Sequence, residues 1–183
     1  MCCCTRCSNP RVLHSPVQRL LAQPLDVAGF APFGKVIAAD GLDGRPINGG
    51  TTLRFDVVPD LRLTLGGGRP LLALYRAAAR RFPLPLVEFE RHARGSQAFV
   101  PLAGARFVVV VARADAPLSA GELRAFAVAG TQGVVLAPGT WHHALLARDA
   151  GDFVVLERGA PAGEPEDCEV RYLEAPIELV LDA

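Results

Sequence analysis

The chain has 183 residues, which suits one domain, and half of them are hydrophobic, which is enough for a packed core. Basic and acidic residues both number 19, and the resulting zero net charge argues against a strongly basic nucleic-acid surface. The purest apolar run in the middle of the chain, residues 107–112, is far shorter than the ~20 residues that a membrane-spanning helix needs. We therefore expect a globular protein with neither nucleic acid nor membrane as partner.

The N-terminal segment is rich in cysteine: four of the five cysteines lie in the first seven residues, and the fifth is Cys168. A zinc site would need a second cysteine pair, and a secretory signal would need an apolar run. We interpret residues 1–24 as a disordered extension, in which residues 16–23 could form a short helix, and residues 25–183 as one domain. Without a regular disulfide framework, a reducing cytoplasm is the expected location.

Asp26 can cap a one-turn helix through Phe30, which Pro32 and Gly34 end. After this turn the pattern changes to short apolar runs separated by glycine- and proline-rich turns. The expected strands are residues 34–38, 52–58, 71–76, 86–92, 97–102, 106–113, 123–128, 134–137, 144–148, 152–158 and 170–173.

Residues 107–111 are apolar throughout, so this strand should be covered on both faces. Residues 119–122 have the form of a capping box for a short helical turn. Many short strands at close spacing are typical of an all-β barrel or a double-stranded jelly roll, here with one or two short helices.

The first segment that could carry chemistry runs from Glu90 to Gln97. Side chains alternate along a strand, so Glu90 and His92 share one face, and a tight turn at Gly95 can bring Gln97 back beside them. A carboxylate, an imidazole and an amide could bind a divalent metal or a small polar substrate. The simpler alternative is an exposed strand face with a charged rim.

The second segment runs from Pro138 to His143 and contains Trp141 and His142. Adjacent histidines on a strand point to opposite faces, so only one of them can share a pocket. Trp141 could supply a large wall to that pocket. A lone histidine is usually a satisfied core or surface residue, but three of the chain's four histidines fall in these two segments. By contrast, we interpret the acidic residues 164–169 as a solvated loop and expect no nucleophilic role for Cys168.

Together the two segments are similar to the two-part cupin motif, which implies a cupin-like β-barrel. Glu90-x-His92 stands where that motif has His-x-His, and Gln97 stands where it has an acidic residue. Gly104 and the Pro-Gly pair three places before His142 fit the motif's spacing. The pattern makes Glu90, His92, Gln97 and His142 candidate ligands of a divalent metal. Because glutamine is a weak ligand, that metal would be loosely held or absent.

The chain also resembles the ureidoglycolate lyase family (also described as ureidoglycolate hydrolase) over about residues 26–170. The stretches that carry the resemblance are Phe30-Ala31-Pro32-Phe33-Gly34, Ile47-Asn48-Gly49-Gly50, Glu90-Arg91-His92, Gly95-Ser96-Gln97-Ala98-Phe99-Val100-Pro101, Leu123-Arg124-Ala125-Phe126, Gln132-Gly133, Trp141-His142-His143, Asp152-Phe153 and Glu157-Arg158-Gly159. The resemblance implies a cytoplasmic homodimer that cleaves ureidoglycolate to glyoxylate and urea in allantoin (purine) breakdown.

Ureidoglycolate carries a hydroxyl, a carboxylate and a ureido nitrogen on one carbon. Breaking its C–N bond needs a base for the hydroxyl proton and an acid for the departing nitrogen. His92 and His142 suit these roles because imidazole titrates near pH ~6.5. Glu90 is a second candidate base, or else a metal ligand.

Substrate binding would need amides and a cation. Asn48 and Gln97 can hydrogen-bond the ureido group, because an amide both donates and accepts. An arginine fork suits the carboxylate. The candidates are Arg54, Arg91 and Arg158, of which Arg91 alternates away from Glu90 and His92.

The chain departs from the family at two places. Many members have Tyr-His-Arg where this chain has Leu136-Ala137-Pro138, and proline where it has Ala144. The first departure motivates another hypothesis, a cupin enzyme acting on a related hydroxy or ureido acid. The sequence also leaves open a non-catalytic cupin that binds a small acid, and hydrolase rather than lyase products.

Overall fold

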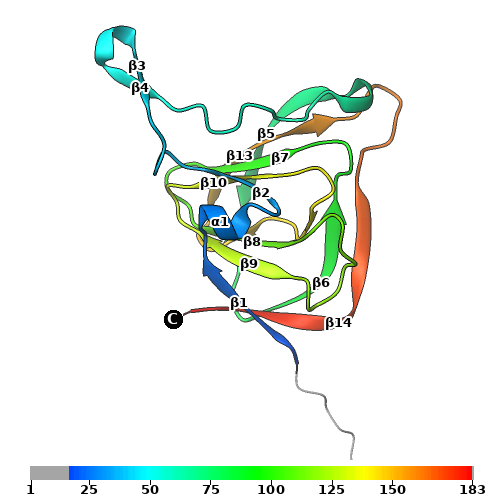
Figure 1. The fold of residues 1–183 in the computed structure, drawn as a ribbon. Helices are drawn as coiled ribbons and strands as arrows, with labels where there is room; N and C mark the ends of the chain where they lie inside the picture. Colours follow the sequence, from blue (N-terminus) through cyan, green and yellow to red (C-terminus); the bar gives the residue numbers. More distant parts are fainter. Residues whose placement is uncertain (1–16, 183) are drawn as a thin grey trace, which may run out of the picture.

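The computed structural model describes residues 17–182, which form two layers of β-sheet (Figure 1). In the first layer six strands close into a ring, because the short β11 pairs with both β6 and β8. In order around the ring these strands are β11 (Trp141–His142), β6 (Leu84–Arg91), β14 (Glu169–Leu181), β1 (Arg19–Pro24), β9 (Arg124–Val128) and β8 (Phe107–Ala112). A further strand, β12 (Leu146–Ala147), pairs with β8.

The second layer is a five-stranded sheet with β2 and β5 at its two edges. Its strands in order are β2 (Gly34–Ile37), β10 (Gly133–Leu136), β7 (Gln97–Pro101), β13 (Gly151–Gly159) and β5 (Arg69–Ala77). A separate hairpin follows β2 and consists of β3 (Arg45–Ile47), the 3-10 turn η1 (Asn48–Gly50) and β4 (Thr52–Arg54). Another 3-10 turn, η2 (Leu65–Gly67), precedes β5. The expected all-β barrel is confirmed.

Strand β8 divides the core in two, because every one of its residues is buried. Phe107, Val109 and Val111 pack between the two sheets, in a cluster with residues such as Phe99 and Phe153. The alternate side chains of β8 pack inside the ring, in a second cluster. Coverage of this strand on both faces, as its unbroken apolar sequence predicts, is therefore confirmed.

The short helix α1 (Val27–Phe30) forms where its cap predicts. The Asp26 side chain accepts a hydrogen bond from the Gly29 N–H at 2.8 Å. Phe30 is fully buried and meets Phe126 edge-on, with the ring centroids 5.4 Å apart. The helix thus closes one end of the space between the sheets.

Two expected helical segments, residues 16–23 and residues 119–122, are wrong. Residues 19–24 form β1 instead of part of a helix, because they pair in parallel with β14 and β9 and bury Ala22 in the ring. The fold therefore begins before Leu25, while residues 1–16, including the cysteine-rich segment, lie outside the described residues. Residues 119–122 make a turn, with the Glu122 N–H donating to the Ser119 carbonyl at 3.1 Å, and not a helix. No helix of the described part is long and apolar enough to cross a membrane.

Candidate active site

Glu90, His92 and His142 come together at one end of the space between the sheets. One potential ligand atom from each lies within 4.8 Å of the other two. His142 stands opposite both Glu90 and Val111 in the ladder, so all three side chains share the face of the core between the sheets. His92 comes directly after β6, two residues beyond Glu90, and so its side chain faces the same side as that of Glu90. The strand alternation expected for this segment therefore brings these three residues together.

The two imidazole rings are held by backbone carbonyls. His92 Nδ1 lies 2.5 Å from the Asp167 carbonyl oxygen, and His142 Nδ1 lies 3.0 Å from that of Thr140. A carbonyl only accepts, so each Nδ1 carries a hydrogen, and in the neutral ring each Nε2 presents a lone pair. Both Nε2 atoms are buried without a hydrogen-bond partner among residues 17–182. Two nitrogen donors are thus aimed at the same space.

Residues 164–169 are mostly exposed, as expected for a solvated loop, but Asp167 also contacts the cluster. Besides the His92 bond, the Asp167 side chain accepts from the Arg94 N–H, and Cys168 Sγ lies 3.6 Å from Glu90 Oε2. Burial, with Glu90 as the next cause, raises the pKa of the Cys168 thiol to about 11. A thiol that keeps its proton at neutral pH is a poor nucleophile. The loop therefore closes one side of the cluster without adding a nucleophile.

Gln97 extends the cluster from the other sheet. It lies opposite Glu157 in the ladder, and its Nε2 donates to Glu157 Oε2 at 2.8 Å. Tyr75 donates to the second oxygen of Glu157 at 3.3 Å. Consequently Gln97 Oε1 is directed away from Glu157, and it is buried without a partner in the described part of the chain. An open cavity of about 360 Å³ is lined by Tyr75, Glu90 and Gln97, among others.

The sequence interpretation missed Tyr75 and Glu157. Phe153 and Val155 face the core, and alternation puts Glu157 on that same apolar face. Glu157 could have been predicted from the sequence, because it is a carboxylate on the apolar face of an expected strand. Burial, followed by the charge of Glu157, raises the pKa of Tyr75 to about 12.

Glu90 and His142 form the closest charged contact in the cavity. His142 Nε2 lies 3.4 Å from Glu90 Oε1, and the approach of this imidazole holds the pKa of Glu90 below its ordinary value, against the opposing effect of burial. A bare Nε2 lone pair would face a carboxylate lone pair here, which is unfavourable. Either a proton on Nε2 or a cation between the two groups resolves this contact.

The structure does not bring Trp141 to the cluster, which corrects its expected role as a pocket wall. Trp141 is adjacent to His142 on β11 and therefore faces the interior of the ring, where it is buried. The Arg91 guanidinium lies 4.4 Å from the centre of its ring and pairs with Glu169 at 2.6 Å. Arg91 alternates away from the cluster as expected, so neither residue reaches the cavity.

Arg158 does not reach the cavity either, so its expected role as a substrate-binding residue is also corrected. It is adjacent to the inward-facing Glu157 and so points to the other side of β13. Its Nε donates to the Leu65 carbonyl at 2.7 Å and its Nη2 to the Gly66 carbonyl at 3.2 Å. A Cβ at Gly95 would come within 2.6 Å of the Arg158 side chain, which explains the need for glycine there. The buried Arg158 therefore holds η2 in place.

Asn48 and Arg54 also lie away from the cluster of their own chain. Both are exposed and belong to the β3–β4 hairpin, which projects from the barrel on the side remote from β6 (Figure 1). Asn48 Nδ2 donates to Thr52 Oγ1 at 3.4 Å, and Arg54 pairs with Asp56 at 2.7 Å. Within one protomer, their expected contact with a substrate in the cavity is not made.

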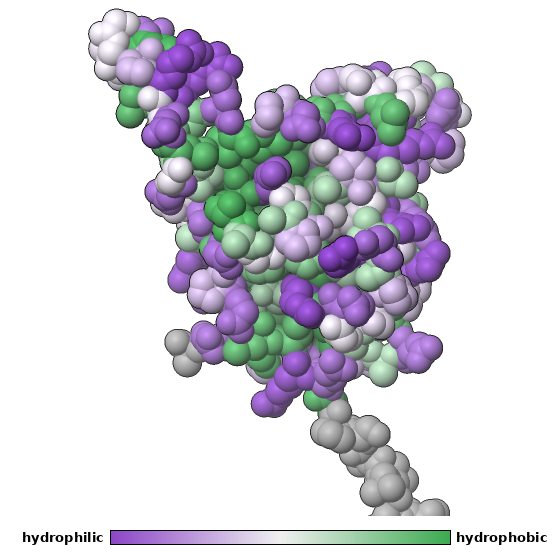
Figure 2. Space-filling model, in the orientation of Figure 1, coloured by the Kyte–Doolittle hydropathy of each residue, from purple (hydrophilic) through white to green (hydrophobic). Residues whose placement is uncertain are grey.

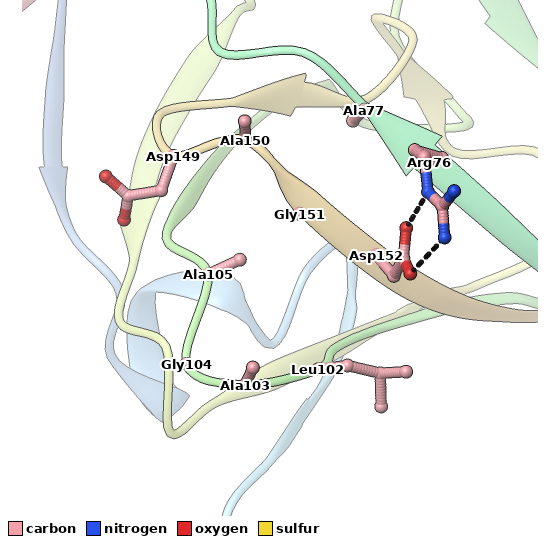
Figure 3. Close-up of a pocket in the computed structure, with 10 residues that line it drawn as sticks. All are labelled: Arg76, Ala77, Leu102, Ala103, Gly104, Ala105, Asp149, Ala150, Gly151 and Asp152. Atoms are coloured by element: carbon pink, nitrogen blue, oxygen red, sulfur yellow. Dashed lines mark hydrogen bonds and ion pairs between the residues drawn. The ribbon is translucent and has the colours of Figure 1, made fainter.

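One arginine, Arg76, lines the cavity but is already paired. Figure 3 shows an adjoining surface hollow that Arg76 also lines, and its guanidinium is directed at Asp152, with bonds of 2.8 and 3.0 Å. Within residues 17–182, no arginine or lysine makes an ion pair or hydrogen bond with Glu90 or Glu157. Apart from the paired Arg76, the described residues that line the cavity are Glu90 and uncharged groups, and the Glu157 carboxylate lies next to Gln97.

The donor set fits a divalent metal ion. Two imidazole nitrogens and a carboxylate oxygen are ligands that zinc, nickel or iron accept, and Gln97 Oε1 could add a weak fourth. The buried, unpartnered Nε2 atoms support this fit, because polar atoms are rarely buried without a partner. Glu90, His92, His142 and Gln97 are thus the residues that could hold a metal.

The closed β-barrel and the carboxylate–imidazole cluster between its sheets define a cupin-like protein. The model of the ureidoglycolate lyase family matches residues 17–180, which is nearly the whole chain. The chain belongs to the ureidoglycolate lyase family.

Individual relatives agree with this assignment. The chain is 46% identical over 168 residues to a ureidoglycolate lyase of Burkholderia mallei (strain NCTC 10229), covering 91% of this chain and 96% of the relative. It is 46% identical over 149 residues to a ureidoglycolate lyase of Burkholderia cepacia, covering 80% and 82%. It is 41% identical over 169 residues to one of Pseudomonas savastanoi pv. phaseolicola, covering 91% and 96%. The similarity thus extends over the whole barrel.

Proposed function

We propose that this protein is a ureidoglycolate lyase that cleaves ureidoglycolate to glyoxylate and urea. The observation that carries the proposal is that His92, His142 and Glu90 bring their polar atoms within 4.8 Å of one another, beside a cavity that Glu90 and Gln97 line, in a chain that belongs to this family. These groups supply the base, the acid and the amide acceptor that the reaction needs.

The two histidines divide the proton transfers. His92 Nε2 takes the hydroxyl proton of the substrate, and the carbonyl of glyoxylate forms as the C–N bond breaks. His142 delivers the proton that the departing nitrogen needs to become urea. The carboxylate of Glu90 lies 3.4 Å from His142 Nε2, and this neighbour is the reason for assigning the role of acid to His142. The ring centroids are 5.5 Å apart, so the proton can return to His142 through the substrate site or a water.

Gln97 binds the ureido group. Because Glu157 takes the amide N–H of Gln97, Oε1 is left to accept an N–H from the substrate. A ureido group has N–H donors at this position, whereas a simple hydroxy acid has none. This contact favours ureidoglycolate over a small hydroxy acid without nitrogen.

A loosely held divalent metal is the alternative to proton transfer by the histidines, with Glu90, His92, His142 and Gln97 as its ligands. When bound, it would polarise the hydroxyl or carboxylate oxygens of the substrate. An Nε2 atom that coordinates a metal cannot also carry the proton, so the two roles exclude each other at the same atom. Comparing turnover with and without a chelator decides between them.

The cellular setting is proposed on simpler grounds. The reaction belongs to allantoin breakdown, and the free thiol of Cys168 is compatible with a reducing cytoplasm. A homodimer is the proposed assembly. The departure at Leu136-Ala137-Pro138 touches the site at one residue, because Leu136 lies opposite Gln97 and lines a small hollow with His142, whereas Ala137 is exposed.

Substitution of the two histidines tests the proposal. His92→Ala and His142→Ala should each lower kcat by about 100-fold or more, the usual contribution of a general acid or base. Circular dichroism should show an intact fold in both variants. Full activity in both folded variants would show that the catalytic groups lie elsewhere.

A further inference from the structure

The candidate cavity has no free group that complements an anionic substrate. Glu90 lines it, Glu157 lies beside it through its bond to Gln97, and Arg76, the basic side chain among the described residues that line it, is already paired with Asp152 at 2.8 and 3.0 Å. Ureidoglycolate carries a carboxylate, which two fixed negative charges repel. A planar guanidinium would bind that carboxylate with two parallel bonds. The site of a single protomer is therefore incomplete for the proposed substrate.

The β3–β4 hairpin has the opposite character. Arg45 and Arg54 lie directly opposite each other in its ladder, and like charges in such a pair are destabilising. Both side chains of the Arg54–Asp56 ion pair are exposed, so Arg54 can easily exchange Asp56 for another partner. A projecting two-stranded hairpin is marginally stable in water. The hairpin thus has the charge and the exposure of an element that packs against an acidic surface elsewhere.

An apolar surface connects the hairpin with the cavity. On the outer face of the five-stranded sheet, Leu72 is 70% exposed and Leu74 is 58% exposed. Beside them lies a hollow of about 280 Å³, lined by Ile37, Val57, Val58, Leu61, Leu72, Ala98, Val100, Val135, Val154 and Leu156. Figure 2 shows hydrophobic residues gathered below the base of the hairpin. A continuous apolar face of this kind marks a protein interface.

The strand order determines where the hairpin of a second copy would reach. The hairpin follows β2, the cavity borders β5, and these strands are at opposite edges of the sheet. If two copies pack by their outer faces about a two-fold axis along the strands, β2 of each lies over β5 of the other. The hairpin of one copy then arrives at the edge of the other copy's cavity.

We propose that the hairpin of a second copy of this chain completes the active site, with Arg54 binding the substrate carboxylate and Asn48 the ureido group. This inference rests on the proposed function, since the ligand of Arg54 is the carboxylate of ureidoglycolate. It places the two exposed residues in the partner's cavity, which explains why their own cavity does not contain them. Each dimer then has two shared sites.

Activity in mixed dimers tests the proposal. Arg54→Ala should raise KM about 10- to 100-fold, the loss expected for a charged bidentate contact. Arg19→Ala, which removes another exposed and ion-paired arginine, should leave the kinetics unchanged. A heterodimer of His92→Ala and Arg54→Ala chains, isolated by two different tags, has both lesions in one site and none in the other. It should show about half the wild-type activity per dimer at substrate below KM.

Other outcomes overturn the proposal. If each site uses its own hairpin, both sites of the heterodimer carry one lesion, and activity stays at the level of the parent variants. Unchanged kinetics of Arg54→Ala would also overturn it. Wild-type chain assayed in parallel separates these results from failure of the proposed function, which would leave the wild type itself inactive.

A cross-link provides a readout that does not depend on turnover. Thr51→Cys on the hairpin and Ala144→Cys at the cavity should form a disulfide between two copies, one of which is isotope-labelled. Mass spectrometry of the linked peptides identifies the pair against the native cysteines. A link within one chain, or no link at all in the folded mixture, would contradict the exchange of hairpins.

Discussion

At the scale of single residues, the orientation of Gln97 is the detail on which the proposed substrate selection depends. An amide can present either its N–H or its oxygen, and the Glu157 carboxylate fixes the choice because it only accepts. Tyr75 in turn holds the second oxygen of Glu157. The function of Gln97 therefore depends on a residue that need not touch the substrate.

Glu157→Gln should weaken substrate binding, because an amide can accept or donate and no longer fixes Gln97. We expect KM to rise by about 10-fold and kcat to change less, since a hydrogen bond to a charged group contributes about 1.5–3 kcal/mol. Tyr75→Phe keeps the Gln97–Glu157 bond and should have a smaller effect. A fall in kcat at unchanged KM would contradict this role.

The raised pKa of Tyr75 gives a prediction at alkaline pH. The phenol ordinarily ionises at 10.0 but does so at about 12 in the fold, because of burial and then Glu157. A raised folded-state pKa means that this contribution to stability is complete below pH 10.0 and is lost as the pH rises to about 12. The chain has two tyrosines, so ultraviolet titration of Tyr172→Phe observes Tyr75 alone. Ionisation near 10 in the folded protein would show that Glu157 and burial have no such effect.

At the scale of elements, the sequence predicted those features that depend on residues close together in the chain. The cap at Asp26 predicted α1, and alternation predicted the shared face of Glu90 and His92. The partners of β1 are residues 178–181, far along the chain, and no local pattern indicates them. β14 runs through Pro176 because the ladder shifts register between Tyr172 and Ile177, where proline needs no pairing.

The errors within the site have the same origin. Trp141 was expected in the pocket because it adjoins His142, and Arg158 because an arginine fork suits the substrate carboxylate. Adjacent strand residues face opposite sides, and this parity excludes both from the cavity. Asn48 and Arg54 illustrate a different limit, because the position of a projecting hairpin depends on what it packs against.

The central position of β8 predicts a large effect from a small truncation. Val110 is fully buried inside the ring, so Val110→Ala should lower the free energy of unfolding by about 2 kcal/mol. Val170→Ala, at an exposed position of β14, should change it by less than about 0.5 kcal/mol. Urea denaturation measures both values. Equal effects of the two substitutions would contradict the two-sided packing of β8.

At the scale of the whole molecule, the zero net charge conceals an uneven distribution. Glu90 at the cavity and Glu157 beside it have no basic partner within residues 17–182, whereas the hairpin has two arginines opposite each other. An apolar sheet face lies between these regions. Assembly of two copies would bring the opposite charges together and cover the apolar face, so activity and assembly should be linked.

Leu72→Asp should therefore separate the copies, because it places a charge in the proposed apolar interface. Sedimentation should give twice the 19.4 kDa mass of one chain for the wild type and the single mass for the variant. Turnover should fall together with the dimer fraction. Tyr172→Asp, on another exposed surface, is the matched control. A monomeric and fully active wild type would contradict the link.

Product analysis of the wild-type protein with ureidoglycolate tests the central claim most directly. A lyase forms urea and glyoxylate in equal amounts, with no ammonia, and the positions of His92, His142 and Gln97 predict this result. Ammonia and carbon dioxide in place of urea would show hydrolase chemistry. No turnover by the folded protein, with or without added divalent metal, would contradict the assignment of this cavity to ureidoglycolate.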